Sequence, residues 1–474
     1  MIPVVLLVTA FVSVILVTLF IIYQTTPKGK AIPGLKPVDF NGTGNLDKIE
    51  ASGSLHQFLK QLHQQYGPIA SFWFGNKYTV SVASPDMLND LKGVFDRPPE
   101  LFISLLPILG SESIQFKNGE EGRKRRKATD SAFGHSMLRH FCENFNEIAE
   151  ETVQTLAALP QEEGIPLCEH TMVMAIKGIA QTSFGPYFKS DEACRKLRYN
   201  YDVCFREMEK RLDGMPLKVG SDRQKKFDEA LQTIKEMVKD IIKEKQQTIS
   251  QQKAFIDILI NRSDIYPEST LLADAISYMV GGFHNSGYLL AWTLYFLAKD
   301  EQVQEKLYQE VISVAGRSSA IGPKEIAELR YLKQVLNEAM RITVPAAFAA
   351  KVQDVDIQLD GYLIPKGTPV ITAYGAIHQN ENLWPLPDKF DPERFNVENV
   401  KGRHQFAFQP FGLPARRCPG FRFTYYELTV YLAILIRSFK WSLVEGQVIK
   451  RKYGLATFPN TEIWAQIKRR DLFH

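Results

Sequence analysis

Cysteine is scarce in this sequence, and its spacing matches none of the common metal motifs. The 474 residues contain 5 cysteines, at positions 142, 168, 194, 204 and 418. Because no two of them form a Cys-x-x-Cys pair, the zinc and redox motifs built on that pair are excluded. A sparse and odd set in a long chain also excludes a disulfide framework. The pattern indicates reduced thiols in a cytosol-facing domain.

A strong excess of charge is also absent. The formal net charge is only +4, and no basic run is interleaved with aromatic residues, which excludes nucleic acid as a partner. The sequence lacks internal repeats and low-complexity linkers, so it favours one large domain over several. Hydrophobic residues make up 45% and charged residues 23% of the chain, and these fractions are typical of a globular protein.

One long apolar run is present, and it lies at the start of the chain. Residues from Ile2 to Tyr23 are almost all apolar, and about 20 such residues span a bilayer as a helix. A cleaved signal peptide is the alternative, but no basic segment precedes the run and no small-residue cleavage site follows it. We therefore expect 1–25 to be a transmembrane anchor. Lys28 and Lys30 follow it, which places the remainder in the cytoplasm.

Proline, glycine and lysine gather directly after this run, so 26–50 is expected to be a basic hinge. The rest, 51–474, is predicted to be a single domain. Helical spacing of apolar residues dominates it, and strand-like runs occur near 69–82 and 441–468. The expected fold class is therefore mainly α with minor β.

The stretch from Phe411 to Gly420 presents a cysteine just ahead of an apolar helix. It reads Phe-Gly-Leu-Pro-Ala-Arg-Arg-Cys-Pro-Gly, and apolar residues recur at helical spacing after it. The start of a helix and neighbouring arginines both favour a thiolate, the form of cysteine that binds metals. The alternative for an isolated cysteine such as Cys418 is a small buried apolar residue.

Three further patterns carry polar residues. A long apolar helix, expected over 271–298, contains Gly-Gly-Phe-His-Asn-Ser at 281–286. Adjacent glycines cost a helix about 1 kcal/mol each, so they indicate the close approach of something flat or a local opening of the helix. Glu338 and Arg341 stand three apart, on one helix face. The basic run 123–127 is by default a solvated helix face.

Together these motifs resemble the cytochrome P450 superfamily of haem-thiolate proteins. The order Glu-x-x-Arg, Pro-Glu-Arg-Phe and Phe-Gly-x-x-x-Arg-x-Cys-x-Gly carries the resemblance. It implies a triangular helical fold with small antiparallel sheets, a haem b cofactor, and Cys418 as the iron ligand. Arg416 would contact a haem propionate, and Phe411 would lie beside the sulfur in a loop closed by Gly420. Pro414 stands where the family usually has glycine.

The resemblance also assigns roles outside the cysteine loop. Arg126 stands at the position of a propionate-binding arginine, where its planar fork could bind a carboxylate bidentately. Gly122 replaces the tryptophan that usually accompanies it. Glu338 and Arg341 would interlock with Arg394 as the structural motif of the family.

The central helix departs from the family pattern. In the resembled proteins an acid and an alcohol relay protons there, whereas this chain has His284, Asn285 and Ser286. We consider these three residues the catalytic candidates. For His284 a hydrogen-bonded core residue, a proton relay and a sixth iron ligand are the competing interpretations. Asn285 can orient water but supplies no proton.

The resemblance implies a monooxygenase that inserts one oxygen atom of O2 into an apolar organic substrate. Electrons would come from NADPH through a flavoprotein reductase, with a cytochrome b5-like donor as a second candidate. Microsomal members suggest a single-pass protein of the endoplasmic reticulum membrane. Short strings such as Phe72-Trp-Phe-Gly75 resemble the vertebrate family twenty. A haem-thiolate isomerase or peroxygenase that needs no reductase, and a non-catalytic haem sensor or carrier, remain alternatives.

Overall fold

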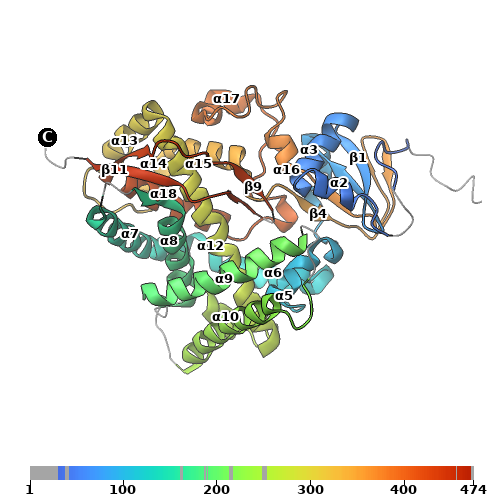
Figure 1. The fold of residues 1–474 in the computed structure, drawn as a ribbon, viewed down its shortest axis with the longest axis horizontal. Helices are drawn as coiled ribbons and strands as arrows, with labels where there is room; N and C mark the ends of the chain where they lie inside the picture. The colour runs from blue at the N-terminus through green and yellow to red at the C-terminus, as the bar shows by residue number, and fades with distance from the viewer. Residues whose placement is uncertain are drawn as a thin grey trace, which may run out of the picture.

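The structure, a computed structural model, describes residues 30–37, 42–160, 164–185, 188, 190–212, 217–247, 254–454 and 456–470. Figure 1 shows a large helical body crossed by α12 and, beside it, a smaller region that holds β1, β4, α2, α3 and α16. The predicted anchor, 1–25, lies outside the described residues. Among the helices that are described, none is long and apolar enough to cross a membrane.

Helices make up most of the described chain. The α-helices are α2 (Leu46–Ala51), α3 (Leu55–Tyr66), α4 (Pro85–Asp90), α5 (Leu106–Leu109), α6 (Gly119–Asp130), α7 (His135–Ala158), α8 (Leu167–Phe184), α9 (Asp191–Leu212), α10 (Asp222–Gln247), α11 (Phe255–Ile260), α12 (Glu268–Lys299), α13 (Glu301–Ala315), α14 (Pro323–Glu328), α15 (Arg330–Thr343), α16 (Tyr374–His378), α17 (Val397–Lys401) and α18 (Phe421–Ser438). Short 3-10 helices are η1 (Leu91–Gly93), η2 (Pro99–Leu105), η3 (Ile114–Phe116), η4 (Ser131–Phe133), η6 (Pro392–Phe395) and η7 (Pro414–Arg416).

The strands of the described residues form four small sheets. They are β1 (Ile69–Phe74), β2 (Lys77–Val82), β3 (Ile165–Pro166), β4 (Ala349–Lys351), β5 (Ile357–Leu359), β6 (Tyr362–Ile364), β7 (Val370–Thr372), β8 (Phe439–Leu443), β9 (Arg451–Tyr453), β10 (Thr457–Pro459) and β11 (Trp464–Arg469). Their orders are β1-β2-β7-β4, β10-β9, β3-β11-β8 and β5-β6.

The largest sheet corrects one expectation. Three sheets are antiparallel as predicted, but β2 and β7 run parallel in the fourth, with Val80 opposite Val370. Parallel neighbours need a long crossover connection. Here that crossover contains α4 to α15, most of the helical body, because β2 ends before α4 and β7 begins after β6. The predicted hairpin of β1 and β2 is confirmed, with Ile69 paired to Val82.

The described part of the expected hinge lies against this sheet. Gly34 forms a bridge to Ser71, and Gly44 forms one to Phe74. A Cβ on either glycine would collide with the β1 backbone, so both positions depend on the missing side chain. The segment is thus part of the folded domain, which begins before residue 51.

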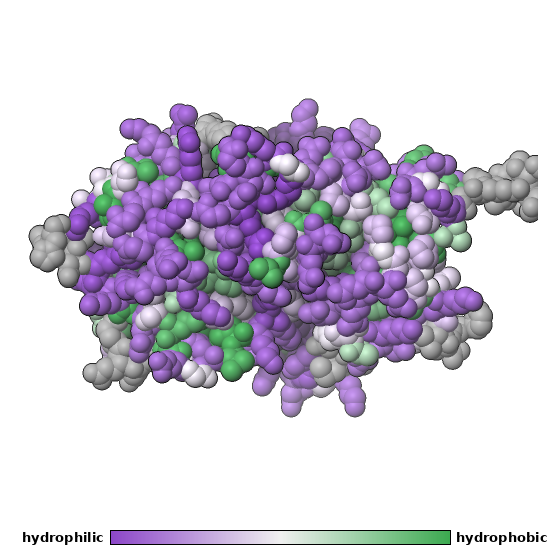
Figure 2. Space-filling model, turned by 90° about the horizontal axis from the view of Figure 1, so that it is seen from above, coloured by the Kyte–Doolittle hydropathy of each residue, from purple (hydrophilic) through white to green (hydrophobic). Residues whose placement is uncertain are grey.

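The helical body has its own large core. It joins α5 to α15 with α18 and the β3-β11-β8 sheet, and two smaller apolar clusters lie at the β1-β2-β7-β4 sheet. The face in Figure 2 is mostly hydrophilic, with hydrophobic side chains in small separate groups. The apolar residues are therefore mainly inside, and α12 is buried along much of its length.

Helix α12 closely matches the predicted 271–298 helix, but its glycines do not open it. The helix is continuous from Glu268 to Lys299. At Gly282 a Cβ would overlap the side chain of Ile179 on α8, so this glycine permits close helix packing. At Gly281 no atom lies within 4 Å of the position of a Cβ, so this face of α12 is open.

Candidate active site

A cavity of about 440 Å³ lies inside the chain, between the cysteine loop and α12. Its wall combines the thiol of Cys418, the glycines Gly281 and Gly282, and apolar side chains such as Phe102 and Phe348. Residues far apart in the sequence thus meet around one space. The predicted cofactor residues Arg126, Phe411, Arg416 and Gly420 also line it, as do His284, Asn285 and Ser286.

The cysteine loop directs its thiol into this cavity. Cys418 has exposed surface although it lies deep within the protein, because its surface faces the cavity. Its backbone N–H donates to the carbonyl of Phe411 over 2.9 Å, which closes the loop. The ring of Phe411 packs edge-on against Tyr425 of α18, with ring centres 5.5 Å apart. The loop therefore presents one sulfur from a backbone fixed at both ends.

Pro414 is accommodated without distortion of the loop. It opens η7, where a proline needs no N–H partner and already has the required φ. The residue with positive φ is Gly412, at 78°, where glycine is favoured. The departure from the family pattern at 414 thus leaves the turn intact.

The thiol is set to bind a metal only when it loses its proton. Burial raises the pKa of Cys418, whereas the backbone N–H of Gly420 and the charges of Arg126 and Arg97 lower it. A thiolate at this position would be stabilised by the same groups.

Four cationic side chains gather at one end of the cavity: Arg97, Arg126, Lys351 and Arg416. Burial and mutual repulsion lower the pKa of Arg97 to about 10, of Lys351 to about 7, and of Arg416 to about 9. A buried cluster of like charges is unfavourable unless an anion balances it. The cluster therefore predicts an anionic ligand at this end.

Some N–H groups of these arginines have no partner among the described residues and could bind such a ligand. Arg416 donates from Nη2 to the carbonyls of Ile114 (2.8 Å) and Lys117 (3.0 Å), while its Nε and Nη1 have no partner among the described residues. Nε of Arg97 is likewise buried without a described partner. Arg126 donates to the carbonyl of Arg417 over 2.8 Å. Backbone carbonyls thus hold Arg416 and, together with the carboxylate of Asp130, Arg126. Arg97 is held by the side chain of Gln115, and some N–H groups of Arg97 and Arg416 have no described partner.

The residues present fit a haem. Its two propionates would meet the arginines, its flat ring would lie against the open face at Gly281, and its iron would meet the sulfur of Cys418. When bound, the haem supplies the redox and oxygen chemistry. The chain supplies the anion site, the thiolate and the apolar wall.

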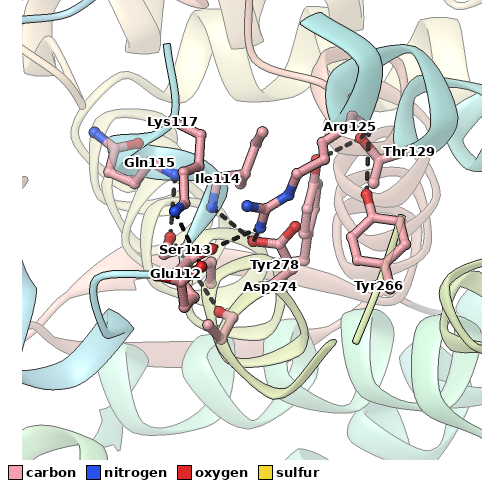
Figure 3. Close-up of polar contacts among 12 residues, drawn as sticks. Glu112, Ser113, Ile114, Gln115, Lys117, Arg125, Thr129, Tyr266, Asp274 and Tyr278 are labelled. Carbon is pink, nitrogen blue, oxygen red and sulfur yellow. Dashed lines mark hydrogen bonds and ion pairs between the residues drawn. The ribbon is translucent and has the colours of Figure 1, made fainter. Parts of the chain in front are cut away.

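A buried polar network ties this end of the cavity to α12 (Figure 3). Arg125 of α6 and Asp274 of α12 form an ion pair of 2.6 Å, both almost fully buried. The same carboxylate accepts the N–H of Ile114 over 2.6 Å, and the carbonyl of Ile114 accepts from Arg416. Asp274 therefore positions η3, which in turn holds Arg416.

This network corrects the view of the basic run 123–127. Arg123, Lys124 and Lys127 are exposed, as expected for a solvated face, but Arg125 is 1% exposed. Gly122 is also buried, and a Cβ there would meet the carbonyl of Lys117. A tryptophan at this position has no space, which explains its absence.

Asn285 and Gly281 are the most exposed residues of α12 in the cavity wall. The residues next to them in the chain are buried or half-buried, and the two stand four apart, on one face. Asn285 is an amide, so it can orient a bound group but carries no acidic proton.

His284 points toward α9. Its Nδ1 and the hydroxyl of Tyr201 share a hydrogen bond of 3.0 Å, and its ring lies 4.4 Å from that of Phe205. Burial lowers the pKa of His284 to about 3, so the imidazole is neutral. Of the three interpretations, the geometry favours the hydrogen-bonded core residue over the relay and the iron ligand.

The predicted structural motif is brought together outside the cavity. Glu338 and Arg341 are completely buried and form two contacts of 2.7 Å. Arg394 lies 3.2 Å from the same carboxylate, and Arg341 also donates to the carbonyl of His378. The cluster joins α15 to η6.

The comparisons with known proteins agree with this arrangement. The family model described as Cytochrome P450 matches residues 33–468. Cytochrome P450 20A1 of Bos taurus is 32% identical over 450 residues, which cover 95% of each chain. The Homo sapiens protein of that name is 31% identical over 455 residues, again 95% of each chain. Cytochrome P450 4F12 of Homo sapiens is 29% identical over 441 residues, 85% of this chain and 81% of that protein.

The chain belongs to the cytochrome P450 family. Membership makes it a haem-thiolate monooxygenase, an oxidoreductase whose cofactor contains haem iron. The likeness to the vertebrate family twenty, expected from short strings, is confirmed by the relatives named 20A1.

Sequence reasoning missed several residues of this cytochrome P450 site. Arg97 and Asp274 stand in no motif, and only the fold brings them to the cavity end. Tyr201 gave no signal, because α9 reads as an ordinary amphipathic helix. Glu427 of α18 is buried behind the cavity wall and does not line it, and for this residue a signal existed: a lone acid among the apolar residues of the helix that follows Cys418.

Proposed function

We propose that this cytochrome P450 takes electrons from NADPH through a flavoprotein reductase and inserts one oxygen atom of O2 into an apolar organic substrate. The observation that carries the proposal is a single thiol, Cys418, opening into a largely apolar cavity with the free face of α12 in its wall. In this proposal Cys418 is the iron ligand, and its loop includes Phe411 and Gly420. Arg97, Arg126 and Arg416 hold the propionates.

The chain's own residues would do three things for the reaction. Phe102, Phe348 and their apolar neighbours bind the substrate and keep water out of the cavity. Gly281 leaves room for the haem, and Asn285 orients a polar group beside it. Cys418 would hold the haem iron as a thiolate, a ligand that would supply electron density favouring O–O cleavage when the haem is bound.

An electron donor would meet the exposed basic side chains of α6. Arg123, Lys124 and Lys127 are exposed on that helix, next to Arg126, which lines the cavity. Basic patches speed the encounter with acidic partners. A flavoprotein reductase is the proposed donor, and a cytochrome b5-like protein is the second. We also propose a single-pass location in the endoplasmic reticulum membrane, with the haem domain, from the folded hinge to 474, on the cytoplasmic side.

Turnover assays test the proposal. The full chain loaded with haem is supplied with reductase and NADPH, or with cumene hydroperoxide alone, over a panel of apolar substrates. Product that requires reductase and NADPH supports the proposal. Product from the hydroperoxide alone would establish a peroxygenase or isomerase instead, and no product in either arm would favour a haem sensor or carrier.

The isomerase or peroxygenase is a serious second candidate because of one observation. The α12 motif contains no carboxylic acid: His284 is neutral and engaged with Tyr201, and Asn285 carries no acidic proton. Reductive splitting of O2 consumes two protons, so a chain with no proton source would be limited to reactions that begin from a peroxide.

A further inference from the structure

Glu427 of α18 is a carboxylic acid in an unusual place. It is 0% exposed, and neither oxygen has a hydrogen-bond partner among the described residues. Buried polar groups are nearly always paired, and an unpaired one calls for an explanation in function or bound water. Gly178 of α8 leaves the space that the carboxyl occupies, because a Cβ at this glycine would collide with the Glu427 carboxyl.

The groups around Glu427 are few. The titratable side chain that faces it is Tyr431, whose hydroxyl donates to the carbonyl of Met174 over 3.1 Å. The hydroxyl that acts on its carboxyl is that of Ser286 on α12. The two groups interact, although no hydrogen bond joins them among the described residues, and one bridging water would connect them.

Ser286 connects this acid to the cavity. It is buried but lines the cavity wall. Two other hydroxyl groups of α12 donate hydrogen bonds to backbone carbonyls of the same helix. Ser277 donates to the carbonyl of Ala273 and Thr293 to that of Leu289, both over 2.7 Å. Among the described contacts, Ser286 forms no such backbone bond, so its hydroxyl is available to the acid on one side and the cavity on the other.

We propose that Glu427, acting through the hydroxyl of Ser286, supplies protons to the cavity in place of the acid that α12 lacks. This proposal rests on the proposed function, because only a reductase-driven reaction needs these protons. In each transfer the O–H bond of Glu427 breaks as a new O–H bond forms on Ser286. The original proton of Ser286 then passes to an oxygen acceptor in the cavity. The carboxylate regains a proton from cavity water by the reverse route before the second of the two transfers, and again once product has left.

The environment of Glu427 keeps the proton available. Burial raises its pKa well above the usual range, and the Ser286 hydroxyl opposes this only in part. The group is therefore a neutral acid at physiological pH, and one proton is stored beside the cavity. Among the motif residues, His284 and Asn285 cannot fill this role, for the reasons given above. Ser286 touches the cavity, and Glu427 is a positioning and proton-supplying residue behind it.

The test compares three variants of the full-length, haem-loaded enzyme. Glu427→Gln keeps the shape and removes the acidic proton, Ser286→Ala breaks the connection, and Thr293→Val is the matched control because its hydroxyl is bonded to the helix. With reductase and NADPH, the first two variants should lose product per NADPH by at least about tenfold and release hydrogen peroxide. The control should match the wild type. Iodosylbenzene, a donor of single oxygen atoms that needs no proton, should support product in all of them.

Two readouts separate a proton role from a structural one. Thermal unfolding of Glu427→Met should occur at the same or a higher temperature than the wild type, since an unpaired buried carboxyl is removed. Infrared spectroscopy should show a carboxylic-acid C=O band that Glu427→Gln abolishes and Ser286→Ala shifts. A lower unfolding temperature for Glu427→Met would overturn the proposal. So would a yield of product per NADPH in Glu427→Gln and Ser286→Ala equal to that in Thr293→Val.

Failure of the proposed function gives a different result. A wild type that forms no product with reductase or with iodosylbenzene would overturn the monooxygenase function itself. In that case the infrared measurement alone tests whether Glu427 and Ser286 are connected. A Glu427 band that is absent, or unchanged by Ser286→Ala, would show that the two groups are not connected.

Discussion

The two walls of the cavity are built on opposite principles. At the cysteine loop, charged groups are held by backbone carbonyls: Arg416 by Ile114 and Lys117, and Arg126 by Arg417. On α12 the most exposed residues in the cavity wall are a glycine and an amide, Gly281 and Asn285, and no charged side chain of this helix lines the cavity. A wall that fixes charge before binding suits a permanent anionic cofactor. A neutral, open wall leaves room for the flat face of that cofactor and suits a substrate that enters and leaves.

Replacement of the thiol gives the largest expected effect and tests the charged wall most directly. Cys418→Ser should lose the thiolate-specific spectrum of the reduced carbon monoxide complex completely, because a hydroxyl is a poor iron ligand at neutral pH. Difference spectroscopy of the reduced protein measures this. The matched control is Cys142→Ser, a buried cysteine of α7 that does not line the cavity, which should keep the spectrum. A retained spectrum in Cys418→Ser would refute the ligand assignment.

The next largest effect is expected on the free energy of unfolding, from a substitution in the Glu338 cluster. Glu338→Gln leaves Arg341 and Arg394 buried without their carboxylate, and such a loss costs about 3–5 kcal/mol. Denaturant unfolding monitored by circular dichroism measures it. Glu398→Gln is the control, since Glu398 and Lys401 form an exposed pair at the same spacing and should matter by less than about 1 kcal/mol. Equal costs for the two variants would refute the structural role.

Removal of one cavity arginine should have a smaller effect, on cofactor binding. Arg416→Leu deletes a cation whose Nε and Nη1 face no described partner, and one charge-assisted hydrogen bond is worth about 1.5–3 kcal/mol. The haem dissociation rate should rise about tenfold or more. Transfer of haem to apomyoglobin measures that rate. Arg417→Leu, next to it but outside the cavity lining, should change the rate little, and no difference between the two would argue against a propionate contact.

The same contrast explains what the sequence predicted and what it did not. The cysteine loop is local: Phe411, Arg416 and Cys418 stand within eight residues, so a motif describes them. Long periodic helices such as α12 were also predictable, because one apolar stripe extends over many turns. Arg97 and Asp274 reach the site from distant segments, and no local pattern marks a residue whose partners lie more than a hundred positions away. Glu427 was marked only as a lone acid in an apolar helix, and that pattern does not show what the carboxyl faces. For His284 the sequence predicted the place on the central helix. It did not predict that the side chain points toward α9, because this depends on how α9 packs against α12.

The smallest effect is expected at that histidine, and it has a distinct pH dependence. Because the pKa of His284 falls from an unfolded value near 6.5 to about 3, the unfolded chain binds a proton that the folded chain does not, and acid favours unfolding. The stability is fully present above pH 6.5 and is lost as the pH falls toward 3. His284→Phe removes this loss, so at pH 5 it should gain about 2 kcal/mol relative to its own effect at pH 7.

At pH 7 the same change should cost only about 1 kcal/mol, the worth of the bond to Tyr201, and Tyr201→Phe is its matched control without the pH term. Denaturant unfolding at both pH values measures these differences. If His284→Phe instead lost product per NADPH as severely as Glu427→Gln while stability changed little, the imidazole would be relaying protons. The neutral wall of α12 would then contain a working acid–base group, and the division between the two walls would no longer hold.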